Sequence, residues 1–278
     1  MRRGWRFAST LACIAGLAIS LSACLTVPTA QTDAMVAATN DVASASDTLF
    51  ADLNTEEKQL TIRKTNADPN VFVPADAVLY STLGTYAPET AHFYAAISVL
   101  KNYAILVQSL AEGKSATAEA NSIKTTVDNL SAVGKAALPG FSAEIASLDA
   151  AAGAFAPLVE KALAVRTAGQ ARELVQEGAT PVKDTIDALR AATPAMFGLL
   201  YAKNKPAITQ VDFPERDKAR IRLSDFVVLL DRLQDAFDKL NQAFQNPSDP
   251  ATATALAQAS GELAADVKIV QQTLSALR

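Results

Sequence analysis

The sequence predicts an all-α protein: an elongated up-and-down helical bundle of about six to seven long helices with coiled-coil-like packing. Composition favours helix, because 56 of the 278 residues are alanine whereas only 11 are glycine and 12 are proline. Seven stretches also place apolar residues at alternating steps of three and four, which gathers them on one helical face. A spacing close to 3.5 residues, shared by successive helices, favours packing at shallow angles.

The first 23 residues are predicted to be an export signal that is removed from the mature chain. Arg2, Arg3 and Arg6 give a positively charged start, an apolar run follows over 11–21, and small residues close the segment. The run is too short for a permanent membrane-spanning helix, which needs about 20 residues. Removal takes away three bases and no acid, so the formal net charge falls from −4 to −7. With no basic block to neutralise phosphates, a nucleic-acid partner is not expected.

Leu21-Ser22-Ala23-Cys24, at the end of the signal, resembles the lipobox of bacterial lipoproteins. The resemblance implies cleavage between Ala23 and Cys24, diacylglyceryl transfer to the Cys24 thiol, and acylation of the new amino group, for example with palmitate. An ordinary secretory signal with an incidental cysteine is the alternative. Two or three acyl chains would hold the protein on a membrane. Leu25 is not the aspartate that retains enteric lipoproteins in the inner membrane, so we expect an outer-membrane protein facing the periplasm.

Residues 24–31 are expected to form a lipidated tether, and residues 32–278 a single helical-bundle domain. The clearest apolar seam lies near the C-terminus and steps 4, 3, 4, 3, 4. It consists of Phe226, Leu230, Leu233, Phe237, Leu240 and Phe244. The same rhythm occurs in 93–111, 182–200 and 263–277, and weaker versions occupy 33–64, 116–138 and 142–165.

Clusters of proline, glycine and short polar residues separate these stretches and are expected to form the turns. They lie at 68–74, 112–114, 138–140, 205–214 and 246–250. Pro157, Pro181 and Pro194 lie within helical patterns, where each removes a backbone hydrogen bond and should kink or restart a helix. The helix boundary within 166–181 is left open. Apolar residues in 71–74 and 208–213 are expected to cover the ends of the core, or else to form exposed patches.

Side chains able to support catalysis or metal binding are few. The one histidine is His92, Cys13 belongs to the leader, Cys24 carries the lipid, and the carboxylates are spread over helix surfaces. No spacing typical of a zinc protease, a serine hydrolase, a phosphate-binding loop or a calcium loop occurs. The sequence therefore predicts a protein that is not an enzyme and that holds no cofactor and no metal. We expect His92 at a surface or boundary position near a helix start.

Tyrosines are concentrated in one part of the body, since four of the five lie within 80–103. If Phe93 marks the buried seam, His92 and Tyr103 project about 90° to one side of it and Tyr94 about 100° to the other. Flanking tyrosines usually lay the ring on the core and keep the hydroxyl in water. The alternative is a ligand or partner surface, formed by Tyr86, His92, Tyr94 and Tyr103.

A run of mixed charges at 215–222 follows Pro214, which fits the first turn of a helix. The expected role is a solvated, salt-bridged face. The alternative is an anion or headgroup site, using Arg216, Arg220 and Arg222.

These observations favour a non-enzymatic, membrane-anchored envelope lipoprotein that acts as a helical interaction or structural module. Its expected partners are the membrane, through Cys24, and another envelope protein. The alternative is a small-molecule or lipid-binding bundle that uses the tyrosine-rich helix, and a cavity beside those tyrosines would distinguish it. A third hypothesis is a membrane-active protein whose helices insert into the bilayer. The body contains no continuous apolar hairpin of about 18 or more residues, which counts against this hypothesis.

Overall fold

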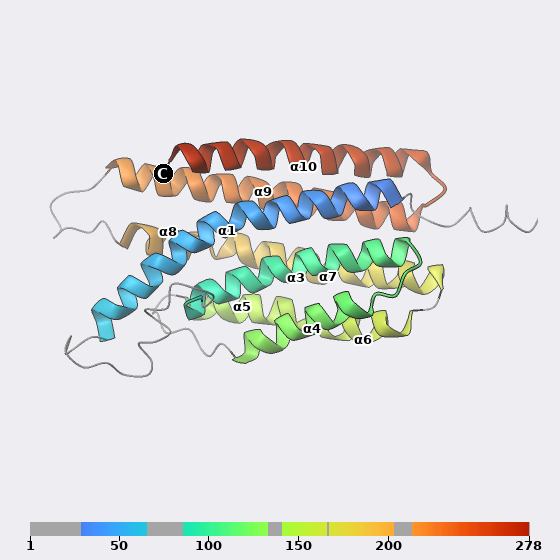
Figure 1. Cartoon of the computed structure of the whole chain (residues 1–278), viewed down its shortest axis with the longest axis horizontal. Helices are drawn as coiled ribbons and strands as arrows, with labels where there is room; N and C mark the ends of the chain where they lie inside the picture. Colours follow the sequence, from blue (N-terminus) through green and yellow to red (C-terminus); the bar gives the residue numbers. More distant parts are fainter. Residues whose placement is uncertain (1–28, 66–85, 133–140, 166, 203–212, 278) are drawn as a thin grey trace, which may run out of the picture.

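Helices pack lengthwise through their apolar faces in the computed structural model, which describes residues 29–65, 86–132, 141–165, 167–202 and 213–277 (Figure 1). The described helices are α1 (Thr29–Thr65), α3 (Pro88–Ala111), α4 (Thr117–Ala132), α5 (Ser142–Gly153), α6 (Ala156–Ala164), α7 (Ala168–Ala191), α8 (Thr193–Ala202), α9 (Phe213–Gln245) and α10 (Pro250–Ala276). No strand occurs within these ranges. The predicted all-α bundle is confirmed.

Two of the three internal prolines restart a helix, as the sequence predicts. Pro157 lies in the first turn of α6, directly after α5, and Pro194 lies in the first turn of α8, directly after α7. If α5 with α6, and α7 with α8, are each counted as one interrupted helix, the described residues form seven long helices. Pro181 differs, because α7 continues through it.

The start of α7 resolves the boundary that the sequence left open in 166–181. Thr167 is the N-cap: its hydroxyl accepts a hydrogen bond from the Gln170 amide, and the Gln170 side chain accepts one from the Thr167 amide. This reciprocal arrangement is a capping box, which satisfies two amides of the first turn at once. The pattern Thr-x-x-Gln was therefore readable in the sequence as a helix start.

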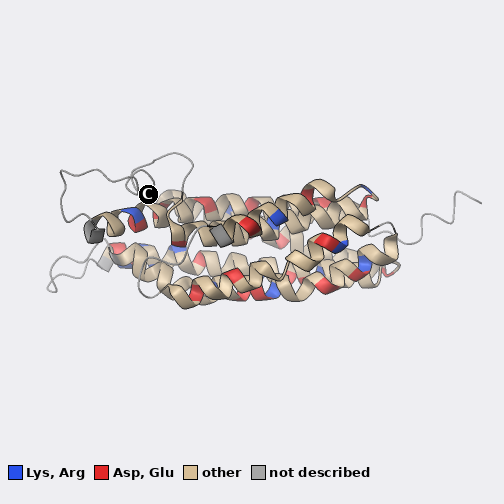
Figure 2. Ribbon diagram, turned by 90° about the horizontal axis from the view of Figure 1, so that it is seen from below, with Lys and Arg blue, Asp and Glu red and all other residues tan. Residues whose placement is uncertain are grey.

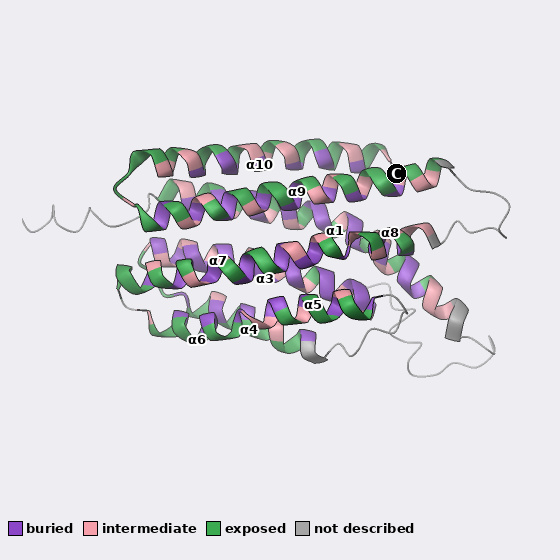
Figure 3. Ribbon diagram, turned by 180° about the vertical axis from the view of Figure 1, so that it is seen from behind, coloured by how far each residue is buried: buried purple, intermediate pink, exposed green. Residues whose placement is uncertain are grey.

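The seams predicted at 226–244 and 93–111 are buried along their length (Figure 3). All six residues of the 226–244 seam are buried, where α9 packs against α1, α7, α8 and α10. The seam of 93–111 is buried in the same way, where α3 packs against α1, α4, α5 and α7. One continuous apolar core therefore joins the described helices.

The bundle has two distinct ends. The start of α1, the turn from α3 to α4, the junction of α6 and α7, and the turn from α9 to α10 gather at one end, at the right of Figure 1. We name it the tether end, because α1 begins five residues after Cys24. The opposite end, named the far end, holds the end of α1, the starts of α3 and α9, and the end of α10. Helix α1 begins three residues before the domain boundary expected at residue 32.

The turns at 112–114 and 246–250 form as predicted. Gly113 adopts a left-handed backbone (φ 69°), and the amide of Lys114 donates to the Ser109 carbonyl at 2.8 Å, which closes the end of α3. Asp249 caps α10 by accepting from the Ala251 amide at 2.9 Å. The described residues do not include the predicted turns at 68–74 and 138–140, the apolar segment 71–74, or 205–212 of the predicted turn 205–214 and apolar segment 208–213. Phe213 and Pro214 belong to the first turn of α9 and not to a turn between helices.

Basic and acidic residues are interspersed along the helices of the bundle (Figure 2). The start of α9 is a salt-bridged face as expected: Lys218 pairs with Glu215 at 2.8 Å and Arg216 with Asp217 at 2.9 Å. Arg222 departs from the solvated face. It binds Asp52 of α1 at 2.8 Å and the Leu277 carbonyl at 3.1 Å, so it joins three helices at the far end.

One helix among the described residues, α3, is long and apolar enough to cross a membrane by length and composition. More than half of its most apolar window is buried inside the bundle. Such burial is what the core helix of a bundle shows.

Candidate functional site

The first turn of α3 is capped by side chains of α1. The N-cap position, Ala87, has no side chain able to accept a hydrogen bond, and Pro88 follows it. Asn54 Oδ1 accepts from the Ala87 amide at 2.8 Å. Glu57 accepts from the Glu89 amide at 2.9 Å and from the Thr90 amide at 2.8 Å. Backbone donors that helices usually satisfy locally are satisfied here by a neighbouring helix.

The Glu57 carboxyl is fully buried, and its protonation is shifted. Burial raises its pKa first, and the adjacent buried Glu89 carboxyl adds to the rise, which brings the pKa to about 9. The Thr90 hydroxyl, which donates to Glu57 at 2.7 Å, and the Glu89 amide act in the opposite direction. Burial and the neighbouring carboxyl therefore favour the protonated form of Glu57.

His92 lies one turn further along α3 and corrects the sequence expectation. It is 1% exposed instead of lying at a surface or boundary. Its Nδ1 lies 2.8 Å from Asp149 Oδ1 of α5, and its buried Nε2 makes no hydrogen bond to the described residues. The reason for the difference is that α5 packs on the side of α3 that carries His92, a contact that the periodicity of one helix does not reveal.

Tyr103 is also in the core, against the expectation of a hydroxyl kept in water. Its ring packs edge-on against Phe155 with centroids 5.5 Å apart, and its hydroxyl donates to the Val175 carbonyl at 3.3 Å. Full burial raises the pKa of Tyr103 above its usual range. The hydroxyl and ring lie directly over Gly178 of α7, where a Cβ would overlap them. The space beside Tyr103 amounts to about 10 Å³, which is less than a ligand needs.

Tyr86 and Tyr94 lie together on the surface of α3. Their rings stack with centroids 4.7 Å apart and planes inclined by 24°, and Tyr94 is 37% exposed. Burial raises the pKa of Tyr86, and the negative charges of the neighbouring Tyr94 and Asp47 raise it further by smaller amounts. The four candidate residues thus divide into an outer pair, Tyr86 and Tyr94, and two inner side chains, His92 and Tyr103.

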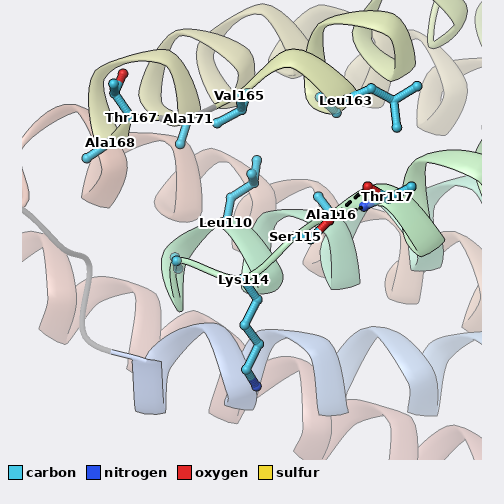
Figure 4. Close-up of a pocket in the computed structure, with 13 residues that line it drawn as sticks. Leu110, Lys114, Ser115, Ala116, Thr117, Leu163, Val165, Thr167, Ala168 and Ala171 are labelled. Carbon is cyan, nitrogen blue, oxygen red and sulfur yellow. Dashed lines mark hydrogen bonds between the residues drawn. The ribbon is translucent and has the colours of Figure 1, made fainter.

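A cavity of about 460 Å³ lies at the tether end, which the sequence analysis did not anticipate. One wall comes from the end of α3, the following turn and the start of α4; the other comes from the end of α6 and the start of α7 (Figure 4). Leu110 projects between the two walls. A high share of alanine at the facing helix ends, 110–117 and 162–171, was the signal available in the sequence.

Among the described residues, no three His, Cys, Asp or Glu side chains come together in a way that could hold a metal ion. The predicted cleavage and lipidation residues, Ala23 and Cys24, lie outside the described part of the chain. Comparison with protein-family models, with curated proteins and with solved structures finds no match to this chain.

Proposed function

We propose that this chain is a membrane-anchored lipoprotein of the bacterial cell envelope, without enzymatic activity, that acts as a helical interaction or structural module. The observation that carries the proposal is the joining of the Cys24 lipobox to the bundle: α1 starts only five residues later and runs along the long axis. A rod anchored at one end holds its other end away from the membrane. At 1.5 Å per residue the 33 residues of α9 extend about 50 Å.

The outer tyrosine pair is the partner surface that we favour. Tyr86 precedes α3 at the far end, and Tyr94 lies within the first two turns of that helix. Stacked, partly exposed tyrosines offer a large rigid contact area and two hydroxyl groups, and tyrosine is enriched in protein interfaces. The partner proposed is another envelope protein, at the outer membrane and on its periplasmic side, and not a nucleic acid.

The anchor is tested by fractionating cells that produce the native chain or the Cys24→Ala variant. We expect the native protein in the outer-membrane fraction, with an N-terminal peptide whose mass shows an acylated Cys24. The Cys24→Ala variant should lose both the modification and the membrane attachment. A native chain that retains residues 1–23, or that is exported without lipid, would overturn the proposal.

The partner surface is tested by placing a photo-crosslinking residue at Tyr94, with Ile269 as the control position. Ile269 is a more exposed apolar residue, on α10. We expect one envelope protein to be crosslinked in cells from position 94 and not from position 269. Equal crosslinking from both positions, or none from position 94, would count against an interaction through this pair.

A ligand site beside the tyrosines is the alternative function, and its geometry is unfavourable. Tyr103 is enclosed by Phe155, Phe237 and Gly178, with little space beside it. The larger cavity begins two turns further along α3, around Leu110.

A further inference from the structure

The tether-end cavity exists because small side chains face one another across it. Ala111 and Ala116 on one wall oppose Ala162 and Ala171 on the other, and all four are buried. Leu110, Leu163 and Val165 add larger apolar surface to the lining. Apolar side chains therefore share the lining with polar groups in nearly equal parts, as a site for a molecule with an apolar chain and a polar end requires. The cavity volume lies within the range of about 300–1,000 Å³ typical of ligand sites.

The polar side chains among the described lining residues already have partners. The hydroxyls of Ser115 and Thr117 are hydrogen-bonded to each other at 2.8 Å, and Thr167 is engaged in the cap of α7. Lys114 points away from the cavity, toward α1, and pairs with Glu112 at 2.5 Å (Figure 4). Among the described lining residues Lys114 is the one with a charged side chain, and it does not face inward, so this lining suits an uncharged occupant.

The place of the cavity in the bundle indicates which apolar molecules could reach it. Gln108, at the end of α3, donates to Asp33 at 2.5 Å, and Asp33 lies in the first turns of α1. Four residues separate Cys24 from Thr29, and the five Cα–Cα steps between these two residues reach at most about 18 Å when fully extended. With Cys24 in a bilayer, the cavity lies close to the membrane surface, where apolar chains are abundant.

We propose that the tether-end cavity binds one fatty acyl chain of a membrane phospholipid. The chain would lie against the alanines and Leu110, with its ester end at the hydroxyls of Ser115 and Thr117. Binding of the acyl chain rests on the cavity alone, whereas the membrane as its source rests on the proposed function.

The one tryptophan of the full sequence, Trp5, lies in the predicted leader, so a tryptophan introduced into the mature chain is a simple fluorescence reporter. A Leu163→Trp variant places a single tryptophan at the cavity, and Ile269→Trp places one on the exposed face of α10. Both are made in the unanchored Cys24→Ala mature chain and titrated with 12-bromododecanoic acid, with dodecanoic acid as the unbrominated control. We expect saturable quenching at position 163 and little at position 269. Equal quenching at both positions would overturn the proposal.

Blocking the cavity gives an independent arm. Ala168→Phe adds a ring at an exposed lining position, and Ala257→Phe adds the same ring to an exposed position of α10. In the Leu163→Trp background, Ala168→Phe should weaken binding at least tenfold, whereas Ala257→Phe should leave it unchanged. Circular dichroism confirms that each variant folds, and Ala168→Glu replaces Ala168→Phe if the latter does not. Unchanged binding in the folded blocking variant would overturn the proposal.

A final arm separates the sources of the chain. The lipidated Leu163→Trp protein is placed in phosphatidylcholine vesicles whose acyl chains are brominated. If the tryptophan is quenched, and Ala168→Phe abolishes this quenching, a membrane phospholipid is supported as the occupant. Quenching by the fatty acid in solution but not by these vesicles would overturn the phospholipid as the source and point to the chain on Cys24. If Cys24 carries no lipid, the anchor proposal fails while the solution titration still decides the cavity.

Discussion

A single carboxyl group, that of Glu57, organises the start of α3. It accepts hydrogen bonds from two backbone amides and the Thr90 hydroxyl while it is fully buried beside Glu89. The cost of burying a charge outweighs the favourable donors, which is why the pKa rises to about 9. Protonation of this one residue is therefore linked to the stability of the far end.

We predict that the protein becomes less stable as the pH rises from about 4.5 to about 9. The folded state retains the Glu57 proton up to a pKa of about 9, whereas the unfolded chain releases it near 4.5. The folded state thus binds more protons in this window, and its free energy of unfolding falls by up to about 1.4 kcal/mol per pH unit. Urea unfolding at pH 5, 7 and 9, followed by circular dichroism, measures this slope.

The Glu57→Gln variant isolates the contribution of this carboxyl. Glutamine keeps one oxygen, which can accept one of the two α3 amides, and has no proton to lose. The stability of this variant should therefore fall less between pH 5 and 9. Glu173→Gln, at an exposed position of α7, is the matched control and should keep the native slope. Identical slopes for native and Glu57→Gln proteins would contradict the assignment.

Sequence reasoning found the residues of the α3 start only in part. His92 and the tyrosines were identified by their rarity and clustering, and Tyr86 and Tyr94 do lie together. Glu57 and Glu89 were missed, because a carboxylate within a helical pattern looks like a surface residue. Their burial results from α1 crossing the start of α3, which is a contact between segments more than 30 residues apart in the chain.

At the scale of the helix, apolar periodicity was a sound guide to the buried faces. The apolar seam of 226–244 identifies the core side of α9, because a helix with a single apolar stripe buries that stripe by turning it toward the core. Interruptions were harder to place: Pro157 and Pro194 restart helices, whereas α7 continues through Pro181. Proline near a helix start loses no intrahelical bond, so its position relative to the cap decides the outcome.

Close contact between α3 and α7 requires the absence of a side chain at Gly178. A Cβ there would overlap the ring and hydroxyl of Tyr103, which is itself held against Phe155. We predict that Gly178→Ala destabilises the protein by about 1–3 kcal/mol, because overpacking outweighs the gain in helix propensity. The free energy of unfolding from urea titrations at constant pH is the measurement.

Gly261 of α10 is the control for this substitution, since no atom lies within 4 Å of the place where its Cβ would be. Gly261→Ala should stabilise the protein by up to about 1 kcal/mol, as alanine does in an open helical position. If both variants shift stability in the same direction, close packing at Gly178 is not the determining factor.

For the whole molecule, the fold class was predictable because every local signal agreed. Abundant alanine, seven apolar seams and clustered turn residues all indicate a bundle, and the described helices form one. The tether-end cavity was not predictable, since it depends on which helix ends meet. Leu110 and Val165 belong to separate helical segments, and nothing in either segment identifies the other as its neighbour.

The proposed anchor predicts an orientation of the whole rod. Ser248, in the turn before α10, lies at the tether end, and Ser275 lies near the other end of the same helix, about 40 Å away over its 27 residues. Fluorophores attached to Ser248→Cys and Ser275→Cys in the lipidated protein should differ in quenching by nitroxide-labelled lipid headgroups. We expect strong quenching at position 248 and weak quenching at position 275. Equal quenching would mean that the rod lies flat on the bilayer.

The capping of α3 by α1 also bears on the order in which the chain folds. Forming the first turn of a helix is the unfavourable step, and α3 has no capping side chain of its own to assist it. The backbone amides at the start of α3 find hydrogen-bond acceptors only once Asn54 and Glu57 of α1 are in place. Nucleation at the start of α3 is therefore coupled to the docking of a helix that precedes it in the chain, which makes the assembly of these two helices a single cooperative step.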